Sequence, residues 1–226
     1  MRPLGSLPGW LWLVLTAALA GQIALHAGTR PGVTAAAELP PPPSPPGLRL
    51  ASFGEPEALA RITMLYLQAY ELGPKLDYAR LIAWLRAILA LDPRSEYPLF
   101  SAARVYAEVP DPARTRLMLE FIYEQYLLDP NRRWPWLAHA ALLAKHRLRD
   151  LPLARRYAAA IDRNTAADDV PLWARQMEVF ILEDMNELEA ARILLGGLLE
   201  SGRIRDADEA RFLEQKLKEL ERRAGQ

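Results

Sequence analysis

Short stretches with helical periodicity, separated by Pro, Gly and Asp, make up the chain from Glu55 onward. Apolar residues recur at helical spacing in each stretch, and no alternating pattern of strand length appears. The breaks fall at dipeptides such as Gly73-Pro74 and Asp92-Pro93, which favour turns and helix ends. Because the connections are short, neighbouring helices are expected to be antiparallel. The sequence predicts an all-α body with helices over roughly 55–72, 77–91, 97–108, 111–128, 134–147, 150–162, 170–183, 187–200 and 206–223.

A spacing of 37 residues relates these segments to one another. Asp92-Pro93 recurs as Asp129-Pro130, and 129 − 92 is 37. Tyr97-Pro98-Leu99 is followed at the same spacing by Trp134-Pro135-Trp136 and then by Trp173. Each proline is expected in the first turn of a helix, where its missing N–H costs nothing. A fixed period of this length is typical of stacked helical repeats. The three first helices then align as Leu99–Ala103–Tyr106, Trp136–Ala140–Leu143 and Trp173–Met177–Phe180.

These motifs resemble those of the tetratricopeptide repeat family, whose unit is a helix hairpin of about 34 residues. Leu91-Asp92-Pro93 and Leu128-Asp129-Pro130 match the tripeptide that often closes such a unit, and Leu99–Ala103–Tyr106 matches its first-helix pattern. The sequence departs from the family in its longer period and in Met177, which replaces a small residue. The resemblance covers about residues 55–200 and implies an α-solenoid of about four helix hairpins. It also implies a concave surface that binds peptides or partner proteins and performs no chemistry.

The last predicted helix differs from the others. Its apolar residues form one narrow stripe, and charged residues fill the rest of its surface. A solenoid needs a polar outer face on its terminal element, so we expect a capping helix at the C-terminal end. The stripe consists of Ala210, Leu213, Leu217 and Leu220.

The N-terminal region has no Asp, Glu, Lys or Arg between Arg2 and Arg30. Within it, Leu7 to Ala27 is apolar and reaches the ~20 residues that a membrane-spanning helix needs. The sequence therefore predicts a short tail over residues 1–6 and a single transmembrane helix over 7–27.

A cleaved signal peptide is the alternative, because Ala18-Leu19-Ala20 fits a small-x-small cleavage site. The segment stays apolar beyond this site, as far as Ala27, which favours a retained anchor. Arg2 lies before the apolar segment, and His26 and Arg30 lie at its other end, so the positive-inside bias is slight. We expect the N-terminus in the cytoplasm and the repeat domain in a periplasm-like space.

Residues 28–50 are predicted to be a Pro-rich linker that precedes the repeat domain, residues 51–226. Six prolines fall within Pro40 to Pro46. Proline fixes φ and lacks an N–H, so this segment is expected to form polyproline II and to extend by ~3.1 Å per residue. We expect a stiff spacer; the alternative is a docking site for an aromatic-lined groove.

The composition and the missing motifs exclude several classes of function. The chain has no Cys, which excludes disulfides, thiolate nucleophiles and thiolate metal sites. Its 28 Lys and Arg balance its 28 Asp and Glu, whereas nucleic-acid-binding proteins usually carry a basic excess. His139 and His146 are seven residues apart, which is not a usual metal-ligand spacing on a helix, and no phosphate-binding loop is present. We therefore expect no nucleic acid, no cofactor and no metal.

The segment from Asp129 to Trp136 is the most unusual in composition. It holds two Arg and two Trp within five residues, and both residue types are enriched at binding hot spots. The alternative is that the Trp rings fill a hairpin interface and the Arg side chains are solvated. The candidate partner-binding residues here are Arg132, Arg133, Trp134 and Trp136.

The first helices of the expected hairpins supply further candidates for the concave surface: Arg104, His139, Lys145, Arg175 and Glu178. Together these features predict a non-enzymatic, membrane-anchored scaffold that binds a protein or peptide partner. One alternative is a secreted periplasmic repeat protein after signal cleavage. Another is a hydrolase on an α-helical superhelix, for which Glu178 or Glu183 would supply the carboxylate.

Overall fold

A computed structural model of the protein describes residues 9–28, 38–70, 76–166, 170–202, 204 and 206–224. Within these residues the chain forms eleven α-helices and one π-helical turn, and no strand. The predicted all-α class is confirmed.

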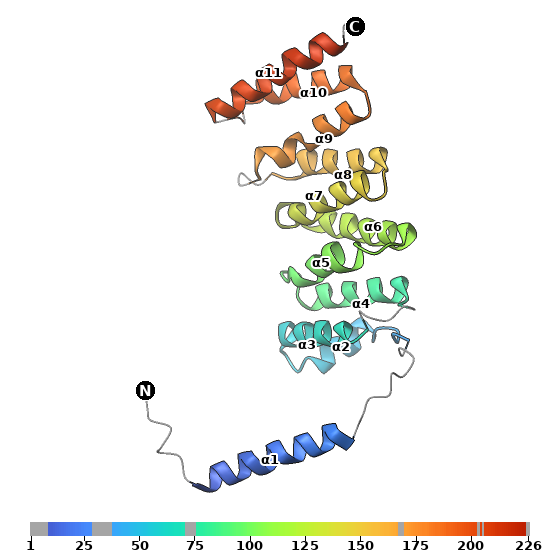
Figure 1. The fold of residues 1–226 in the computed structure, drawn as a ribbon, viewed down its shortest axis with the longest axis vertical. Coiled ribbons are helices and arrows are strands. Elements are labelled where there is room, and N and C mark those ends of the chain that lie inside the picture. The colour runs from blue at the N-terminus through green and yellow to red at the C-terminus, as the bar shows by residue number, and fades with distance from the viewer. Residues whose placement is uncertain are drawn as a thin grey trace.

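From α3 onward, the helices run back and forth across one long axis and stack along it, which gives the body a solenoid-like form (Figure 1). Most helices pack mainly against the elements that precede and follow them in the chain. The short helix α2 (Pro45–Ala51) packs against α4 and belongs to the same stack. The elements that follow it are, in order, α3 (Pro56–Gln68), α4 (Tyr78–Leu91), α5 (Tyr97–Ser101), the π turn η2 (Ala102–Tyr106), α6 (Pro112–Leu128), α7 (Pro130–His146), α8 (Leu151–Asn164), α9 (Leu172–Asp184), α10 (Leu188–Glu200) and α11 (Ala207–Ala224).

Aspartates cap the starts of several of these helices, at residues 77, 111 and 150, where the predicted helical ranges also begin. The carboxylate of Asp77 accepts hydrogen bonds from the backbone N–H groups of Ala79 and Arg80 at the start of α4. Asp111 does the same at the start of α6. Each carboxylate satisfies N–H groups that have no partner inside the helix, which stabilises the first turn.

The cap of α8 gives a pH-dependent prediction. Asp150 accepts a hydrogen bond from the Leu153 N–H at 2.9 Å, and this bond, with the Arg116 guanidinium 2.8 Å away, holds the pKa of Asp150 below its usual value. The ionised Asp150 carboxylate therefore stabilises the folded protein at any pH above the pKa that Asp150 has in the unfolded chain. This contribution is lost as the pH falls through the lower pKa of the folded state. Asp150→Ala is expected to cost about 1–2 kcal/mol near neutral pH. Urea unfolding at several pH values measures this difference, which should shrink as the pH falls below about 4, the ordinary pKa of an Asp; a constant difference would contradict the assignment.

Two groups of buried side chains form the interior. The larger extends from Leu39 to Ile181, and the smaller joins α9, α10 and α11. Fully buried alanines occur on both α7 and α8, and such small side chains let two helices approach closely. On α11, Leu213 and Leu220 are buried, whereas most of its charged side chains are exposed. The smaller group thus closes the C-terminal end of the stack.

The spacing of helix starts is less regular than the spacing of sequence motifs. The helices α4, α6, α8 and α10 begin at residues 78, 112, 151 and 188, which are 34, 39 and 37 apart. Helix α7 begins at Pro130 rather than at 134, so Pro135 lies inside the helix and not in its first turn as expected. The reason is that Asp129-Pro130 is itself a helix start, and the Arg133 N–H donates to the Asp129 carbonyl at 3.1 Å.

The last part of the expected linker belongs to the stack. Leu39 and Leu48 are buried in the larger interior group, and α2 packs against α4. The Trp84 Nε1–H donates to the Pro40 carbonyl at 2.7 Å, and the Arg80 guanidinium donates to the Leu39 carbonyl at 2.9 Å. A Pro-rich segment makes no internal hydrogen bonds, so its carbonyls are available to such donors.

Helix α1 (Gly9–Gly28) lies apart from the stack (Figure 1). Its side chains at Trp10 and from Trp12 to Gln22 are exposed. Within the part of the chain that is described, none of the helices combines the length and the apolar character needed to cross a membrane. The expected tail, the first two residues of the expected span and most of the segment that joins α1 to the stack lie outside the described residues.

Candidate binding cleft

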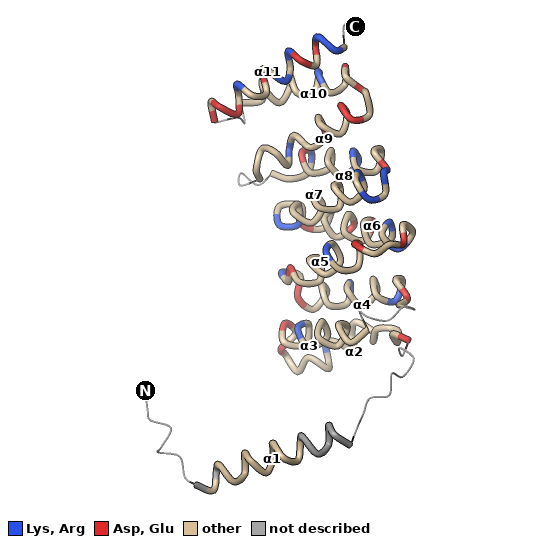
Figure 2. Tube along the Cα trace, in the orientation of Figure 1, with Lys and Arg blue, Asp and Glu red and all other residues tan. Residues whose placement is uncertain are grey.

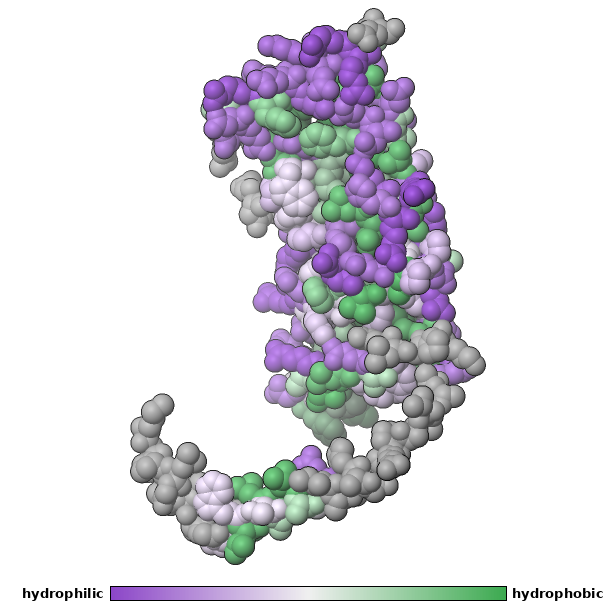
Figure 3. Space-filling view, viewed as in Figure 1, coloured by the Kyte–Doolittle hydropathy of each residue, from purple (hydrophilic) through white to green (hydrophobic). Residues whose placement is uncertain are grey.

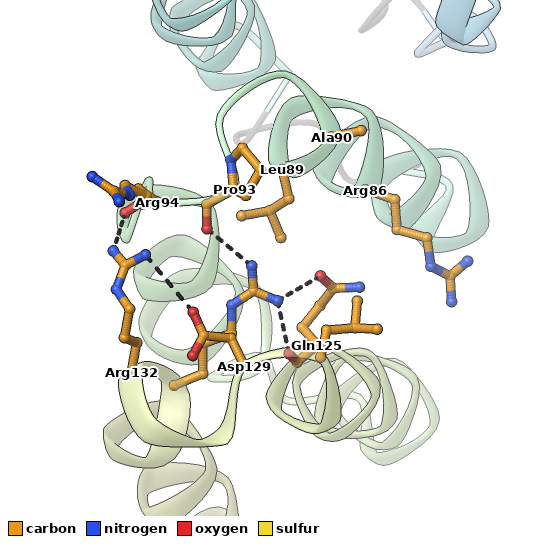
Figure 4. Close-up of a pocket in the computed structure, with 10 residues that line it drawn as sticks. Arg86, Leu89, Ala90, Pro93, Arg94, Gln125, Asp129 and Arg132 are labelled. Carbon is orange, nitrogen blue, oxygen red and sulfur yellow. Dashed lines mark hydrogen bonds and ion pairs between the residues drawn. The ribbon is translucent and has the colours of Figure 1, made fainter. Parts of the chain in front are cut away.

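A cleft of about 960 Å³ lies between α4, α6 and the start of α7 (Figure 4). It falls between the two copies of the Leu-Asp-Pro motif, because Pro93 lines one side and Asp129 the other. Its lining consists of Arg86, Leu89, Ala90, Pro93, Arg94, Gln125, Leu128, Asp129, Arg132 and Arg133.

Arg133 forms the inner wall of the cleft and is a structural residue. Only 7% of it is exposed, and its guanidinium donates to the Gln125 carbonyl at 2.7 Å, to the Gln125 side-chain oxygen at 3.2 Å and to the Pro93 carbonyl at 3.1 Å. Burial lowers the pKa of this guanidinium. The planar fork of Arg133 therefore ties the loop after α4 to the end of α6.

The other three arginines of the lining are accessible. Arg132 donates to the Arg94 carbonyl at 2.8 Å and lies 3.7 Å from the Asp129 carboxylate. Arg94 and Arg132 lie on one side of the opening, and Arg86 lies on the other (Figure 4). Arg86 forms an ion pair with Glu124, which lies outside the lining. The lining holds four guanidinium groups and one carboxylate, so its electrostatic potential favours an anionic ligand.

The expected patch of two Arg and two Trp is divided. Trp134 makes an edge-to-face contact with Trp173, with ring centroids 5.9 Å apart, and Trp136 makes one with Phe100 at 6.0 Å. Neither Trp lines the cleft. The two Arg of the segment therefore face the cleft, while the two Trp connect α7 to α9 and to α5.

The five candidates from the first helices are all engaged within the stack. Arg104 and His139 both contact Glu108, at 3.6 Å and 3.3 Å, and Lys145 forms an ion pair with Asp184. None of the five lines the arginine cleft. The expectation that they line one concave binding surface stays a prediction.

Arg175 and Glu178 on α9 are largely buried. Arg175 donates to the Thr165 carbonyl at 3.1 Å. Glu178 is 4% exposed, and its carboxylate lies 3.2 Å from the Arg155 guanidinium. These contacts tie α9 to α8 and to the loop between them, so both residues are structural in the form described.

Glu183, the second carboxylate considered for hydrolysis, pairs with Lys216 and Arg223 of α11. Partial burial acts to raise its pKa, but the hydrogen bonds from the two cations outweigh burial, so the pKa of Glu183 lies below its usual range. A general acid needs the opposite shift. Among the described residues, no three His, Asp or Glu side chains are grouped so that they could hold a metal ion.

Sequence reasoning missed Arg86 and Arg94. Arg94 directly follows the first Asp-Pro copy, which is a signal that could have drawn attention to it. Arg86 lies within a mostly apolar helix, and nothing local marks it.

In comparisons with known proteins, no family profile, curated protein or solved structure matches this chain.

Proposed function

We propose that the protein is a non-enzymatic, membrane-tethered interaction scaffold of the tetratricopeptide-like type. Its arginine cleft binds an acidic stretch of a partner protein. The observation that carries this proposal is the gathering of four guanidinium groups around a cleft on a chain with no net charge. Both signs of charge are spread along the stack, so the cleft is a local concentration of cations (Figure 2).

Carboxylate side chains are the natural ligands for this lining. Guanidinium groups bind carboxylates through two parallel hydrogen bonds, and such bonds are stronger than those between neutral groups. Arg94 is the residue best placed for this role, because Arg133 is committed to backbone carbonyls and Arg132 partly so. Arg86 can join it by exchanging its exposed ion pair with Glu124 for one with the ligand. The exposed apolar members of the lining, Ala90 and Leu128, would pack against the stems of acidic side chains.

The tether in this proposal is the apolar N-terminal segment. Its support is the absence of charged residues from Pro3 to Thr29 and the helical form of Gly9–Gly28. We place the N-terminus on the cytoplasmic side of the membrane and the stack on the opposite side, in an envelope compartment. A scaffold held there would keep its partner near the membrane.

A charge-reversal variant tests the cleft. Full-length protein in detergent is titrated into a fluorescently labelled Glu-rich peptide, and binding is followed by anisotropy. Arg86→Glu/Arg94→Glu is expected to weaken binding by about tenfold or more, because two attractive contacts become repulsive. Added salt should weaken binding to the original protein as well, since the contacts are partly exposed.

Arg61→Glu/Arg211→Glu is the matched control. It changes the net charge equally, and both arginines are exposed, lie on α3 and α11, and do not line the cleft. Binding that falls equally in the two variants would point to net charge alone, and binding that neither variant changes would place the ligand elsewhere.

A further inference from the structure

The two ends of the stack differ in character. Helix α11 covers the C-terminal end with a hydrophilic surface, whereas apolar side chains are exposed at the end formed by α2 and α3 (Figure 3). A stacked helical protein needs a polar face on each terminal element to stay soluble. We define the end patch as four residues that are 62–94% exposed: Leu50, Phe53, Ile62 and Leu65.

Phe53 is the most exposed residue of the end patch, at 94%, and its backbone is constrained. Its φ is 49°, in the left-handed region that non-glycine residues rarely adopt, and Gly54 follows with a φ of 88°. The Ser52 hydroxyl donates to the Arg49 carbonyl at 2.7 Å, and the Glu55 N–H donates to the Ser52 carbonyl at 2.8 Å. These hydrogen bonds fix the turn, and the turn leaves the phenyl ring of Phe53 exposed.

The charges around the end patch are balanced. Arg49 and Arg61 carry positive charge, and Glu55 and Glu57 carry negative charge. A positively or negatively charged partner therefore gains little from long-range electrostatic attraction. Binding to the end patch depends on apolar contact instead.

The preceding chain indicates what that partner is. Helix α1 ends at Gly28, and the stack begins at Glu38, which lies 3.4 Å from Arg80 of α4. The ten residue steps between 28 and 38 span at most about 36 Å, so the stack cannot move far from the end of α1. If α1 is the tether proposed above, the end formed by α2 and α3 is confined near the surface of the bilayer.

We propose that the end patch rests in the headgroup and upper acyl region of the lipid bilayer. The stack would then stand on the membrane by its α2–α3 end, with α11 pointing away from it. Exposed Phe and Leu side chains are suited to this interface. The proposal depends on the membrane tether but not on the acidic ligand of the cleft.

The absence of cysteine makes a direct test possible. Three single-cysteine variants, Phe53→Cys, Phe212→Cys and Leu15→Cys, are labelled with the environment-sensitive fluorophore NBD and reconstituted at full length into phosphatidylcholine vesicles. Phe212 is the matched control, an exposed aromatic residue on α11 at the other end of the stack. Leu15 reports separately on insertion of α1.

The expected result is a blue-shifted NBD emission at position 53 that lipids brominated in their acyl chains quench, with no such effect at position 212. Position 15 should be quenched as well. Because the patch has balanced charge, replacing a quarter of the lipid with phosphatidylglycerol should leave the signal at position 53 unchanged.

Other outcomes overturn the proposal in distinguishable ways. A quenched probe at position 15 with an aqueous probe at position 53 would remove the bilayer contact and leave the tether intact. Aqueous probes at both positions would remove the tether and the contact together. A blue shift at position 53 that grows with protein density and does not respond to brominated lipid would show that a second copy of the chain covers the patch.

Discussion

Arg133→Ala is expected to lower the free energy of unfolding by about 2–4 kcal/mol. The substitution leaves the Pro93 and Gln125 carbonyls of the cleft wall without their donor, and each of these groups accepts a hydrogen bond from a charged side chain in the native protein. The cost is partly offset because the variant no longer buries a guanidinium. Urea unfolding followed by circular dichroism measures the change.

Two further variants test the role of Arg133. One separates the hydrogen-bonding geometry of the guanidinium from its charge, and the other is a control. Arg133→Lys keeps the charge but cannot donate to both carbonyls in the same geometry, so only part of the stability should return. Arg132→Ala is the neighbouring control and should cost below about 1 kcal/mol, because its side chain is exposed. Equal losses for Arg132→Ala and Arg133→Ala would contradict the structural role of Arg133.

Tyr126→Ala is expected to cost about 3–5 kcal/mol, the largest effect of any single substitution considered. The ring of Tyr126 is fully buried in α6, and its hydroxyl donates to the Ala160 carbonyl at 2.8 Å. The Thr165 hydroxyl lies 2.9 Å from the Tyr126 hydroxyl and donates to it, because Tyr126 gives its only hydroxyl proton to Ala160. Tyr126 therefore joins α6 to the C-terminal part of α8 and to the residue that follows it. Thermal and urea unfolding measure the loss.

Tyr126→Phe apportions this loss between packing and hydrogen bonding. It keeps the ring and removes the hydroxyl, so it should cost about 1–2 kcal/mol. Thr165→Val in the Tyr126→Phe background should add little, because the hydroxyl that it would have contacted is already gone. A Tyr126→Phe variant as unstable as Tyr126→Ala would show that ring packing contributes little.

The helices could be predicted because their boundaries depend on local chemistry. Asp77, Asp111 and Asp150 mark helix starts in the sequence, and in the structure their carboxylates cap α4, α6 and α8. An Asp-Pro pair is a less definite signal, because it is found both at a helix start and in a turn. Asp129-Pro130 begins α7, whereas Asp92-Pro93 forms a turn that ends before α5.

The placement of the arginines could not be predicted from local composition. Arg133 was expected either to bind a partner or to be solvated, yet its acceptors lie 8 and 40 residues away in the chain. Only the stacking of α4 against α6 brings these acceptors together. The cleft itself combines Arg86 and Arg94 with Arg132, and no single segment of the sequence contains all three.

The Pro-rich segment shows the same limit. Its prolines predicted a spacer separate from the body, but Leu39 and Leu48 are buried beside α4. Two apolar residues among many prolines were a weak signal, and the indole of Trp84, which holds the Pro40 carbonyl, lies more than forty residues later.

Photo-crosslinking in the cells that make the protein tests the central claim most directly. Benzoylphenylalanine is placed at Ala90, an exposed residue in the cleft, and at Glu214, an exposed residue of α11, in the full-length chain. The account predicts a specific adduct with one membrane-associated partner from position 90 that disappears with Arg86→Glu/Arg94→Glu, and no such adduct from position 214. The same adduct from both positions, or an adduct at position 90 that survives the charge reversal, would contradict it.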